Sequence, residues 1–232
     1  MAYVQGVLDQ VNVCILIPVY NERKEIGRLV ESLKRKSFDV VVIDDGSTDD
    51  SGKAAQEQGA VVIGHDQKQG KGRSLRDGFE YILKENKYDG VVTIDGDGQH
   101  DIGDIEQFLV QAQEHPESII TGTRMTNPQG MPPVRLWTNR LMSGLISFLC
   151  RQKIPDTQCG FRLISASVLQ PLKLTCDDFQ IETEVLIKAA KLGFKIYSVP
   201  IKTIYRGEAS KINPVLDTFR FLVYIIKEMR GK

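Results

Sequence analysis

Several features are missing from this chain of 232 residues, and each absence excludes a class of protein. The 30 basic residues (Lys and Arg) balance the 30 acidic ones, so overall charge gives no sign of nucleic-acid binding. No apolar run approaches the ~20 residues that a membrane-spanning helix needs. The first residues lack the basic and apolar regions of a signal peptide. We therefore expect a globular, cytoplasmic protein.

Cysteine and phosphate-binding motifs are absent too. The four cysteines form no CxxC pair and no Cys/His spacing typical of zinc sites, so we expect free thiols in a reducing compartment. Neither GxxxxGK(S/T) nor a GxGxxG after the first apolar run is present. The basic turn Gly70-Lys71-Gly72 leaves two interpretations open: Lys71 reaches a diphosphate, or the turn is solvated.

Apolar runs alternate with helical patterns along the chain. Strands are predicted at 13–18, 40–43, 60–63, 90–94, 118–121 and 195–201, and the first and fourth of these read as buried. Apolar residues spaced three and four apart predict helices at 22–36, 50–58, 73–84 and 103–114. This alternation with short connections predicts an α/β fold, with a mostly parallel central sheet and helices on both faces.

Polar residues follow four of these strands. Residues 20–22 follow the first strand, 44–47 the second, 95–100 the fourth, and Arg124 the fifth. Ligands of parallel sheets bind outside the carboxyl ends of the strands. The alternative, a set of ordinary polar loops, weakens with each added cluster.

Two aspartates directly after the fourth strand suggest a metal site. Asp95 and Asp97 are two residues apart, so an extended chain points both carboxylates to the same side. Two close carboxylates repel unless a cation lies between them. With Gln99, they offer the hard oxygen ligands that suit Mg²⁺ or Mn²⁺.

Two other interpretations of this stretch are a calcium-binding EF-hand loop and a polar turn without a ligand. An EF-hand starting at Asp95 has oxygen ligands at positions 1, 3 and 12, but His100 stands where the sharp turn needs glycine. The preceding residues also predict a strand, not a helix. The EF-hand is therefore disfavoured, and the polar turn stays open.

Three motifs together resemble those of family 2 glycosyltransferases with the GT-A fold. In chain order they are Ile17-Pro18-Val19-Tyr20-Asn21-Glu22, Asp44-Asp45-Gly46-Ser47-Thr48-Asp49 and Asp95-Gly96-Asp97-Gly98-Gln99-His100. More narrowly, residues 11–211 resemble the dolichol-phosphate mannose synthase-like branch, the polyprenyl-phosphate glycosyltransferases. That resemblance adds a GT-A (Rossmann-like) sheet to the expected fold.

The resemblance implies roles for the matching residues. Asp95, Asp97 and Gln99 would hold Mg²⁺ or Mn²⁺ against the diphosphate of a nucleotide-sugar donor. The implied donor-binding residues are Pro18, Tyr20, Glu22, Asp44, Asp45, Gly96, Asp156, Arg206 and Lys211. Asp44 and Asp45 are alternative contacts to the base or ribose. Ser210 would join Arg206 and Lys211 in closing over the diphosphate, and a charged loop is the alternative there.

The acceptor side of the resemblance lies further along the chain. Residues 132–149 start with two prolines and become a strongly apolar helix. Arg124, Arg140 and Ser143 match positions that grip the acceptor phosphate, because guanidinium groups suit phosphate. Arg140 and Ser143 are three apart, as on one helix face. Arg124 and Arg140 join Asp95 and Asp97 as the predicted catalytic residues, whereas Arg135 is better explained as a solvated helix start.

A carboxylate before a later helix leaves the alternative that the acceptor is a hydroxyl group. Relatives that glycosylate hydroxyl groups use a carboxylate as general base, and Glu182 matches that position. A phosphate acceptor is already ionised and needs no base, and the QxxRW motif of processive polysaccharide synthases is absent. Phosphate acceptors are therefore favoured. Gln158 and Arg162 are predicted to contact the donor sugar or to brace the site.

The predicted organisation is a GT-A domain at 1–211 and an amphipathic helix at 212–232. The domain has a nucleotide-sugar half at about 11–125 and an acceptor half at about 126–211. The terminal helix has an apolar stripe and a basic end. It could lie on a membrane, dock on a partner such as a membrane protein, or pack on its own core.

The predicted function is an inverting, metal-dependent transfer of sugar from a nucleotide-diphosphate sugar, of the GDP-mannose or UDP-glucose type, to a polyprenyl or dolichyl phosphate. We expect no nucleic-acid partner, and a cytoplasmic location that includes peripheral attachment to the membrane face. The alternatives are a hydroxyl-directed transferase using Glu182, a nucleotidyltransferase, and a non-catalytic nucleotide-sugar-binding scaffold.

Overall fold

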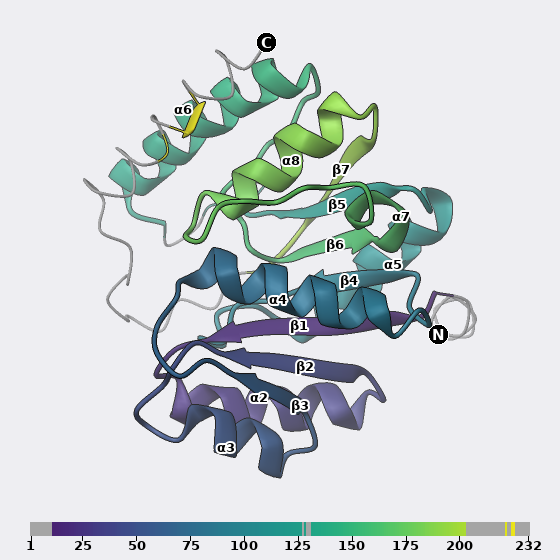
Figure 1. The fold of residues 1–232 in the computed structure, drawn as a ribbon. Helices are drawn as coiled ribbons and strands as arrows, with labels where there is room; N and C mark the ends of the chain where they lie inside the picture. The colour runs from purple at the N-terminus through teal and green to yellow at the C-terminus, as the bar shows by residue number, and fades with distance from the viewer. Residues whose placement is uncertain (1–10, 127, 129–130, 203–220, 222–223, 226–232) are drawn as a thin grey trace.

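The protein is built around one central sheet. The computed structural model describes residues 11–126, 128, 131–202, 221, 224 and 225. In this part of the chain, seven strands pair in the order β3-β2-β1-β4-β6-β5-β7 (Figure 1). Their bounds are β1 Val13–Val19, β2 Asp39–Asp44, β3 Val61–Gly64, β4 Gly90–Thr93, β5 Ser118–Thr123, β6 Arg162–Ser165 and β7 Lys195–Pro200.

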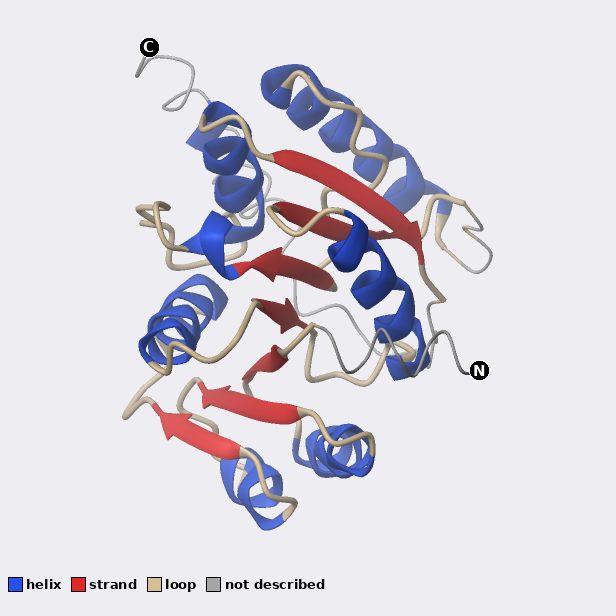
Figure 2. Cartoon of the chain, turned by 90° about the vertical axis from the view of Figure 1, so that its right-hand side faces the viewer, coloured by secondary structure: helices blue, strands red, loops and turns tan. Residues whose placement is uncertain are grey.

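Helices cover both faces of this sheet (Figure 2). Their bounds are α2 Arg23–Arg35, α3 Ser51–Glu57, α4 Lys71–Lys84, α5 Ile105–Glu114, α6 Pro133–Cys150, α7 Ala166–Leu169 and α8 Ile181–Lys191, with a 3₁₀ turn at Ile102–Asp104. The predicted α/β fold with a mostly parallel sheet is confirmed.

Strand β1 divides the hydrophobic core into two layers because its side chains alternate between the faces. Ile15 and Ile17 join one buried cluster with residues of α2, α3 and α5. Cys14 and Leu16 join the other cluster with residues of α4, α6, α7 and α8. The predicted strands at 13–18, 40–43 and 90–94 are therefore largely buried on both faces, as expected for parallel strands, whereas the edge strand β3 leaves Val61 46% exposed.

Strand β6 was not expected from the sequence. It lies between β4 and β5 and is antiparallel to both, whereas the other strand pairs described are parallel. Its first residue, Arg162, is opposite Thr93, the last residue of β4. The reversed strand therefore begins at the edge where the parallel strands end, and it brings residues 156–162 beside Asp95.

Two glycines let the start of α4 lie against the segment before α8. A Cβ atom on Gly70 would lie 2.4 Å from the carbonyl oxygen of Asp177. One on Gly72 would lie 2.5 Å from the carbonyl oxygen of Cys176. Gly70 also has a φ of 105°, which side chains other than glycine rarely allow. These contacts fix the position of Lys71 between the two glycines.

The predicted C-terminal helix lies mostly outside the described residues, as does the predicted boundary at 211. Phe221, Tyr224 and Ile225 are described, and all three are buried in the second core cluster. All four cysteines are unpaired, as expected from their spacing, and Cys14 is buried. Among the described helices, none combines the length and apolarity that crossing a bilayer requires.

We predict opposite effects for two glycine-to-alanine changes in helices. Gly72→Ala should destabilise the fold by about 1–3 kcal/mol, because the new methyl group meets backbone atoms that cannot move away. Gly144→Ala in α6 is the matched control, since a Cβ there meets nothing within 4 Å. It should stabilise the protein by about 0.5–1 kcal/mol. Urea unfolding would measure both, and equal effects would contradict the packing described for Gly72.

Candidate active site

Polar residues from distant parts of the sequence meet at one edge of the sheet. The carboxyl ends of β1, β2, β4 and β5 and the beginning of β6 share this edge. Hydrogen bonds join neighbouring loops there: the backbone N–H of Asn21 donates to Ser47 Oγ, and that of Glu22 donates to Ser51 Oγ. The convergence that the sequence predicted is therefore present.

A partly buried ion pair lies at the centre of this edge. The Nζ atom of Lys71 is 2.6 Å from Asp95 Oδ1 and 2.7 Å from Glu182 Oε1. The side chain of Lys71 is only 17% exposed. Burial alone would lower the pKa of Lys71, but Asp95 and Glu182 outweigh it and raise that pKa. Lys71 is therefore a fixed cation, not the solvated side chain that remained open from the sequence.

Asp95 is held ionised by its neighbours. Burial opposes ionisation, but Lys71 and then His100 lower the pKa of Asp95 well below its ordinary range. The Nε2 atom of His100 lies 3.6 Å from Asp95 Oδ2. A Cβ on Gly160 would lie 2.8 Å from the same carboxylate oxygen, so glycine at this position leaves space directly over the carboxylate.

Asp97 has a different environment from Asp95. Its Oδ1 accepts a hydrogen bond from the backbone N–H of Gln99 at 3.0 Å. Burial and the charge of Asp95 raise the pKa of Asp97. Gly98, between Asp97 and Gln99, has a φ of 68°, which allows the chain to turn there. The two carboxylates therefore repel one another, as expected of a pair that shares a cation.

These residues fit a divalent metal ion. In the described part of the chain, no group of three or more His, Cys, Asp and Glu side chains is placed to hold a metal. The charged ligands that the loop after β4 offers are the carboxylates of Asp95 and Asp97. Mg²⁺ is commonly held by one or two carboxylates, with water and substrate phosphates completing the shell. The electrostatic repulsion at Asp97 and the space over Asp95 both suit such an ion.

The predicted nucleotide-binding residues lie at the ends of β1 and β2. Pro18, Tyr20 and Glu22 are half-buried. The ammonium of Lys68 lies 4.1 Å from the centre of the Tyr20 ring. Asp44 accepts hydrogen bonds from the backbone N–H groups of Ser47 and Gly52, at 2.9 and 3.0 Å. Gly96 is buried between the two aspartates.

Asp45 is buried and holds the turn before α4. Its carboxylate accepts hydrogen bonds from the backbone N–H groups of Gln69 and Gly70, at 2.7 and 2.9 Å. His65 Nδ1 lies 2.9 Å from Asp45, and His65 Nε2 lies 3.0 Å from Asp77. Asp45 therefore connects the end of β2 to the turn that positions Lys71. The chain pattern gave no sign of His65, a single histidine between polar residues.

Arg124 and Asp156 form a second buried ion pair. The Nε and Nη2 atoms of Arg124 donate to the two oxygens of Asp156 at 2.7 and 2.9 Å. Asn139 of α6 also donates to Asp156, at 2.8 Å. Burial would raise the pKa of Asp156, but Arg124 and Asn139 lower it. This network fixes the end of β5, α6 and the 156–160 segment relative to one another.

Arg140 and Ser143 have different environments on α6. Ser143 is buried and donates a hydrogen bond to Asn139 Oδ1 at 3.0 Å, while it accepts one from the backbone N–H of Thr157 at 2.9 Å. Arg140 and Arg135 are exposed. The structure therefore does not bring Arg140 and Ser143 to one exposed surface, and their roles toward an acceptor stay predictions.

Arg162 braces the site, one of the two roles considered for it. The guanidinium is buried and donates to the carbonyl oxygens of Cys159, Thr157 and Glu182, at 2.8, 2.8 and 2.5 Å. Gln158 is half-buried and donates a side-chain hydrogen bond to Thr157. The predicted residues Arg206, Ser210 and Lys211 lie outside the described residues.

Sequence reasoning gave too little weight to three residues. Lys71 stood in a turn whose role was open, and its carboxylate partners are 24 and 111 positions away in the chain. Asn139 lies inside an apolar helical pattern and showed no ligand motif. His65 had no partner nearby in sequence. Only the glycines beside Lys71 offered a signal, because they permit a close backbone approach.

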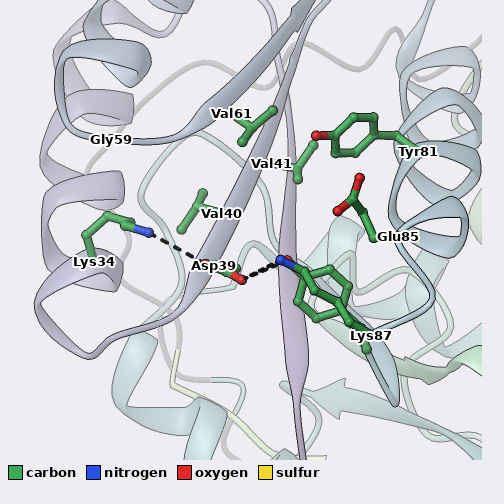
Figure 3. Close-up of a pocket in the computed structure, with 10 residues that line it drawn as sticks. Lys34, Asp39, Val40, Val41, Gly59, Val61, Tyr81, Glu85 and Lys87 are labelled. Atoms are coloured by element: carbon green, nitrogen blue, oxygen red, sulfur yellow. Dashed lines mark hydrogen bonds and ion pairs between the residues drawn. The ribbon is translucent and has the colours of Figure 1, made fainter.

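A pocket lies at the opposite edge of the sheet. It has a volume of about 90 Å³ and lies beside the first residues of β2 and β3. Figure 3 shows Lys34 and Lys87 on either side of Asp39, at 3.9 and 3.4 Å from its carboxylate. None of the predicted site residues lines this pocket, so we do not assign the candidate site to it.

Comparisons with known proteins agree with this geometry. Residues 14–172 match the model of the family "Glycosyl transferase family 2". The glycosyltransferase AglJ of Haloferax volcanii is 32% identical, over 90% of this chain and 67% of that protein. A UDP-N-acetylglucosamine–dolichyl-phosphate N-acetylglucosaminyltransferase of Methanococcus voltae is 30% identical, over 82% of this chain and 85% of that protein. More distant relatives, 23–27% identical, are named dolichyl-phosphate β-glucosyltransferases and an undecaprenyl-phosphate mannosyltransferase.

The fold is also that of a solved glycosyltransferase. Glucosyl-3-phosphoglycerate synthase from Mycobacterium tuberculosis, crystallised with Mn²⁺, uridine diphosphate and phosphoglyceric acid, superposes with a TM-score of 0.69 at 21% identity, covering 90% of this chain and 75% of that chain. The predicted GT-A fold is thereby confirmed, as is the resemblance to the branch that includes the dolichyl-phosphate enzymes. The chain belongs to glycosyl transferase family 2 and is a glycosyltransferase.

Proposed function

We propose that this enzyme transfers a sugar from a nucleotide-diphosphate sugar to a polyprenyl phosphate, with inversion at the anomeric carbon. The main observation in favour is the pair of half-buried carboxylates at the end of β4, Asp95 and Asp97, beside the fixed cation Lys71. The names of relatives that act on dolichyl or undecaprenyl phosphate support the choice of acceptor.

Asp95, Asp97 and Gln99 would hold Mg²⁺ or Mn²⁺. When bound, the ion would neutralise negative charge that develops on the departing nucleoside diphosphate. Lys71 keeps Asp95 ionised and therefore ready as a ligand over the working pH range. Gly160 leaves the space above this carboxylate open for the donor.

The nucleotide and sugar of the donor would lie across the strand ends. Pro18, Tyr20 and Glu22 at the end of β1 would line the nucleotide pocket. Asp44 and Asp45 both accept backbone hydrogen bonds, so we propose that they shape this pocket as well as contact the base or ribose. Asp156 would lie near the sugar, with Gly96 beside the diphosphate, and Arg206 and Lys211 would close over it.

The acceptor would approach from the side of β5 and α6. We propose that Arg124 and Arg140 orient its phosphate, with Ser143 supporting them. Arg124 is held in place by Asp156 before any acceptor arrives. One phosphate oxygen bonds to the anomeric carbon while the bond from that carbon to the diphosphate oxygen breaks, and the nucleoside diphosphate leaves. No proton has to be removed, because a phosphate monoester is ionised near neutral pH.

The proposed metal site predicts the effect of replacing Asp97. Asp97→Ala should reduce transfer to polyprenyl phosphate in detergent by at least about 100-fold, because charge stabilisation at the leaving group is lost. Wild type with Mn²⁺ and its donor at ~100 times the dissociation constant should gain roughly 2.7 kcal/mol of stability. Asp97→Ala should lose this gain, as should wild type in EDTA. The assay would test UDP- and GDP-linked sugars separately.

Glu117→Ala provides the control, since Glu117 is exposed just before β5 and remote from the site. It should keep full activity. Full turnover by Asp97→Ala would rule out the proposed metal role. Pyrophosphate release from a nucleoside triphosphate would point to a nucleotidyltransferase instead. Donor binding without transfer to any acceptor would indicate a scaffold.

A change at Glu182 separates a phosphate acceptor from a hydroxyl acceptor. Glu182 accepts a hydrogen bond from Lys71, and glutamine could accept the same bond. If the acceptor is a phosphate, Glu182→Gln should reduce kcat less than about tenfold and leave the pH profile of kcat unchanged. A general base typically contributes about 10²–10⁴-fold. A loss of that size, with donor binding intact and the acid limb of the profile altered, would favour a hydroxyl acceptor.

A further inference from the structure

Helix α6 buries one side, on which two of the four buried residues are polar. Asn139, Ser143, Ile146 and Cys150 are its buried residues. Asn139 contacts Asp156, and Ser143 contacts Thr157, so this side of the helix faces the candidate site. At about 100° per residue, the four side chains occupy one narrow face of the helix.

The opposite side of α6 is apolar and exposed. Val134, Trp137, Leu141 and Phe148 are 78%, 70%, 76% and 79% exposed. At about 100° per residue they fall within an arc of about 60°, roughly opposite the buried face. Across the described residues, the only other large apolar side chains with comparable exposure are Val61 and Leu192, which lie far apart in the chain. We call Val134, Trp137, Leu141 and Phe148 the α6 stripe.

An ordinary surface helix has the reverse arrangement. Helix α2 buries Ile26, Leu29, Val30 and Leu33 and exposes charged residues such as Lys24 and Arg28. That is the usual pattern, with charge turned to water. Helix α6 instead turns aromatic and aliphatic side chains to the outside, so its outer face suits an apolar environment.

The charged residues within α6 and in the three positions after it all have one sign. Residues 133–150 contain no Asp or Glu, and their two charged residues are Arg135 and Arg140, both exposed. Arg151 and Lys153 follow the helix and are exposed too. Trp and Phe beside basic residues are typical of helices that lie in a membrane interface. An anionic surface would complement this set of charges.

We propose that the α6 stripe docks on the surface of an anionic lipid bilayer. The apolar side chains would enter the boundary between headgroups and acyl chains, and the basic residues would contact lipid phosphates. The choice of a bilayer over a protein rests on the uniform positive charge and, through the proposed function, on an acceptor whose tail lies in lipid. Since the inner face of α6 contacts Asp156 and Thr157, docking would place the site beside the membrane.

The chain offers a direct reporter, because Trp137 is its single tryptophan. With vesicles of phosphatidylcholine containing 30% phosphatidylglycerol (about one anionic lipid in three), the emission of Trp137 should shift to shorter wavelength and be quenched by brominated lipids. Pure phosphatidylcholine and raised salt should both weaken binding. Donor, metal and acceptor are left out, so a negative result here is independent of the transfer reaction.

Two pairs of variants test the residues. Leu141→Ser with Phe148→Ser keeps Trp137 and should lower the vesicle partition coefficient by at least about tenfold in co-sedimentation. Val61→Ser with Leu192→Ser, equally apolar changes outside α6, should leave binding unchanged. The double variant Arg135→Gln with Lys153→Gln should bind anionic vesicles more weakly and leave binding to pure phosphatidylcholine unchanged. The control on α2, Lys24→Gln with Arg28→Gln, should bind both kinds of vesicle as wild type does.

Three results would overturn the proposal. The first is an emission of Trp137 that does not respond to anionic vesicles. The second is equal partitioning of wild type and the Leu141/Phe148 variant. The third is a dimer in solution that the Leu141/Phe148 variant abolishes, which would assign the α6 stripe to a second copy of the chain. If a variant no longer binds vesicles but still transfers sugar to a detergent-solubilised acceptor, the proposed function is unaffected.

Discussion

The salt bridge from Lys71 to Asp95 and Glu182 is the interaction on which the site depends. It joins the start of α4, the loop after β4 and the start of α8 through one ammonium group. Without that cation, Asp95 and Glu182 would face one another as uncompensated anions beside Asp97, a costly arrangement in a partly buried place. The glycines on either side of Lys71 and the amide contacts of Asp45 serve to hold this ammonium in position.

The sequence was sufficient to predict the parallel sheet and the edge that carries the site. Runs such as 91–94 consist of apolar or β-branched residues, and the polar residues that follow them mark the carboxyl edge. It was not sufficient for β6, which has four residues buried on both sides and therefore shows no alternation. Nor could local pattern show that Lys71 is buried, because burial there depends on partners far along the chain. The spacing of Arg140 and Ser143 predicted one shared helix face, but it could not show that Ser143 is buried. Spacing alone does not say which face of a helix packs inward.

Helix α6 explains why a strongly apolar pattern can be misleading when taken as a sign of burial. Two of its four buried residues, Asn139 and Ser143, are polar, because Asp156 and Thr157 supply their hydrogen-bond partners. Its largest apolar residues face outward. Hydrogen bonds to Asp156 and Thr157, together with the buried side chains of Ile146 and Cys150, thus hold the inner face of this helix against the protein. The hydrophobic effect also acts on whatever the outer face meets.

The antiparallel direction of β6 has a consequence for how such a protein can change. The chain leaves the sheet at Thr123 and re-enters it at Arg162, and the neighbouring residues Thr121 and Arg162 are paired across β5 and β6. The 124–161 excursion, including α6, therefore begins and ends at one place and is closed by the sheet itself. Lengthening a loop whose ends are already fixed costs little. This segment can therefore change in length while the strand order stays constant, and under the proposed function such changes would act on the acceptor side of the site.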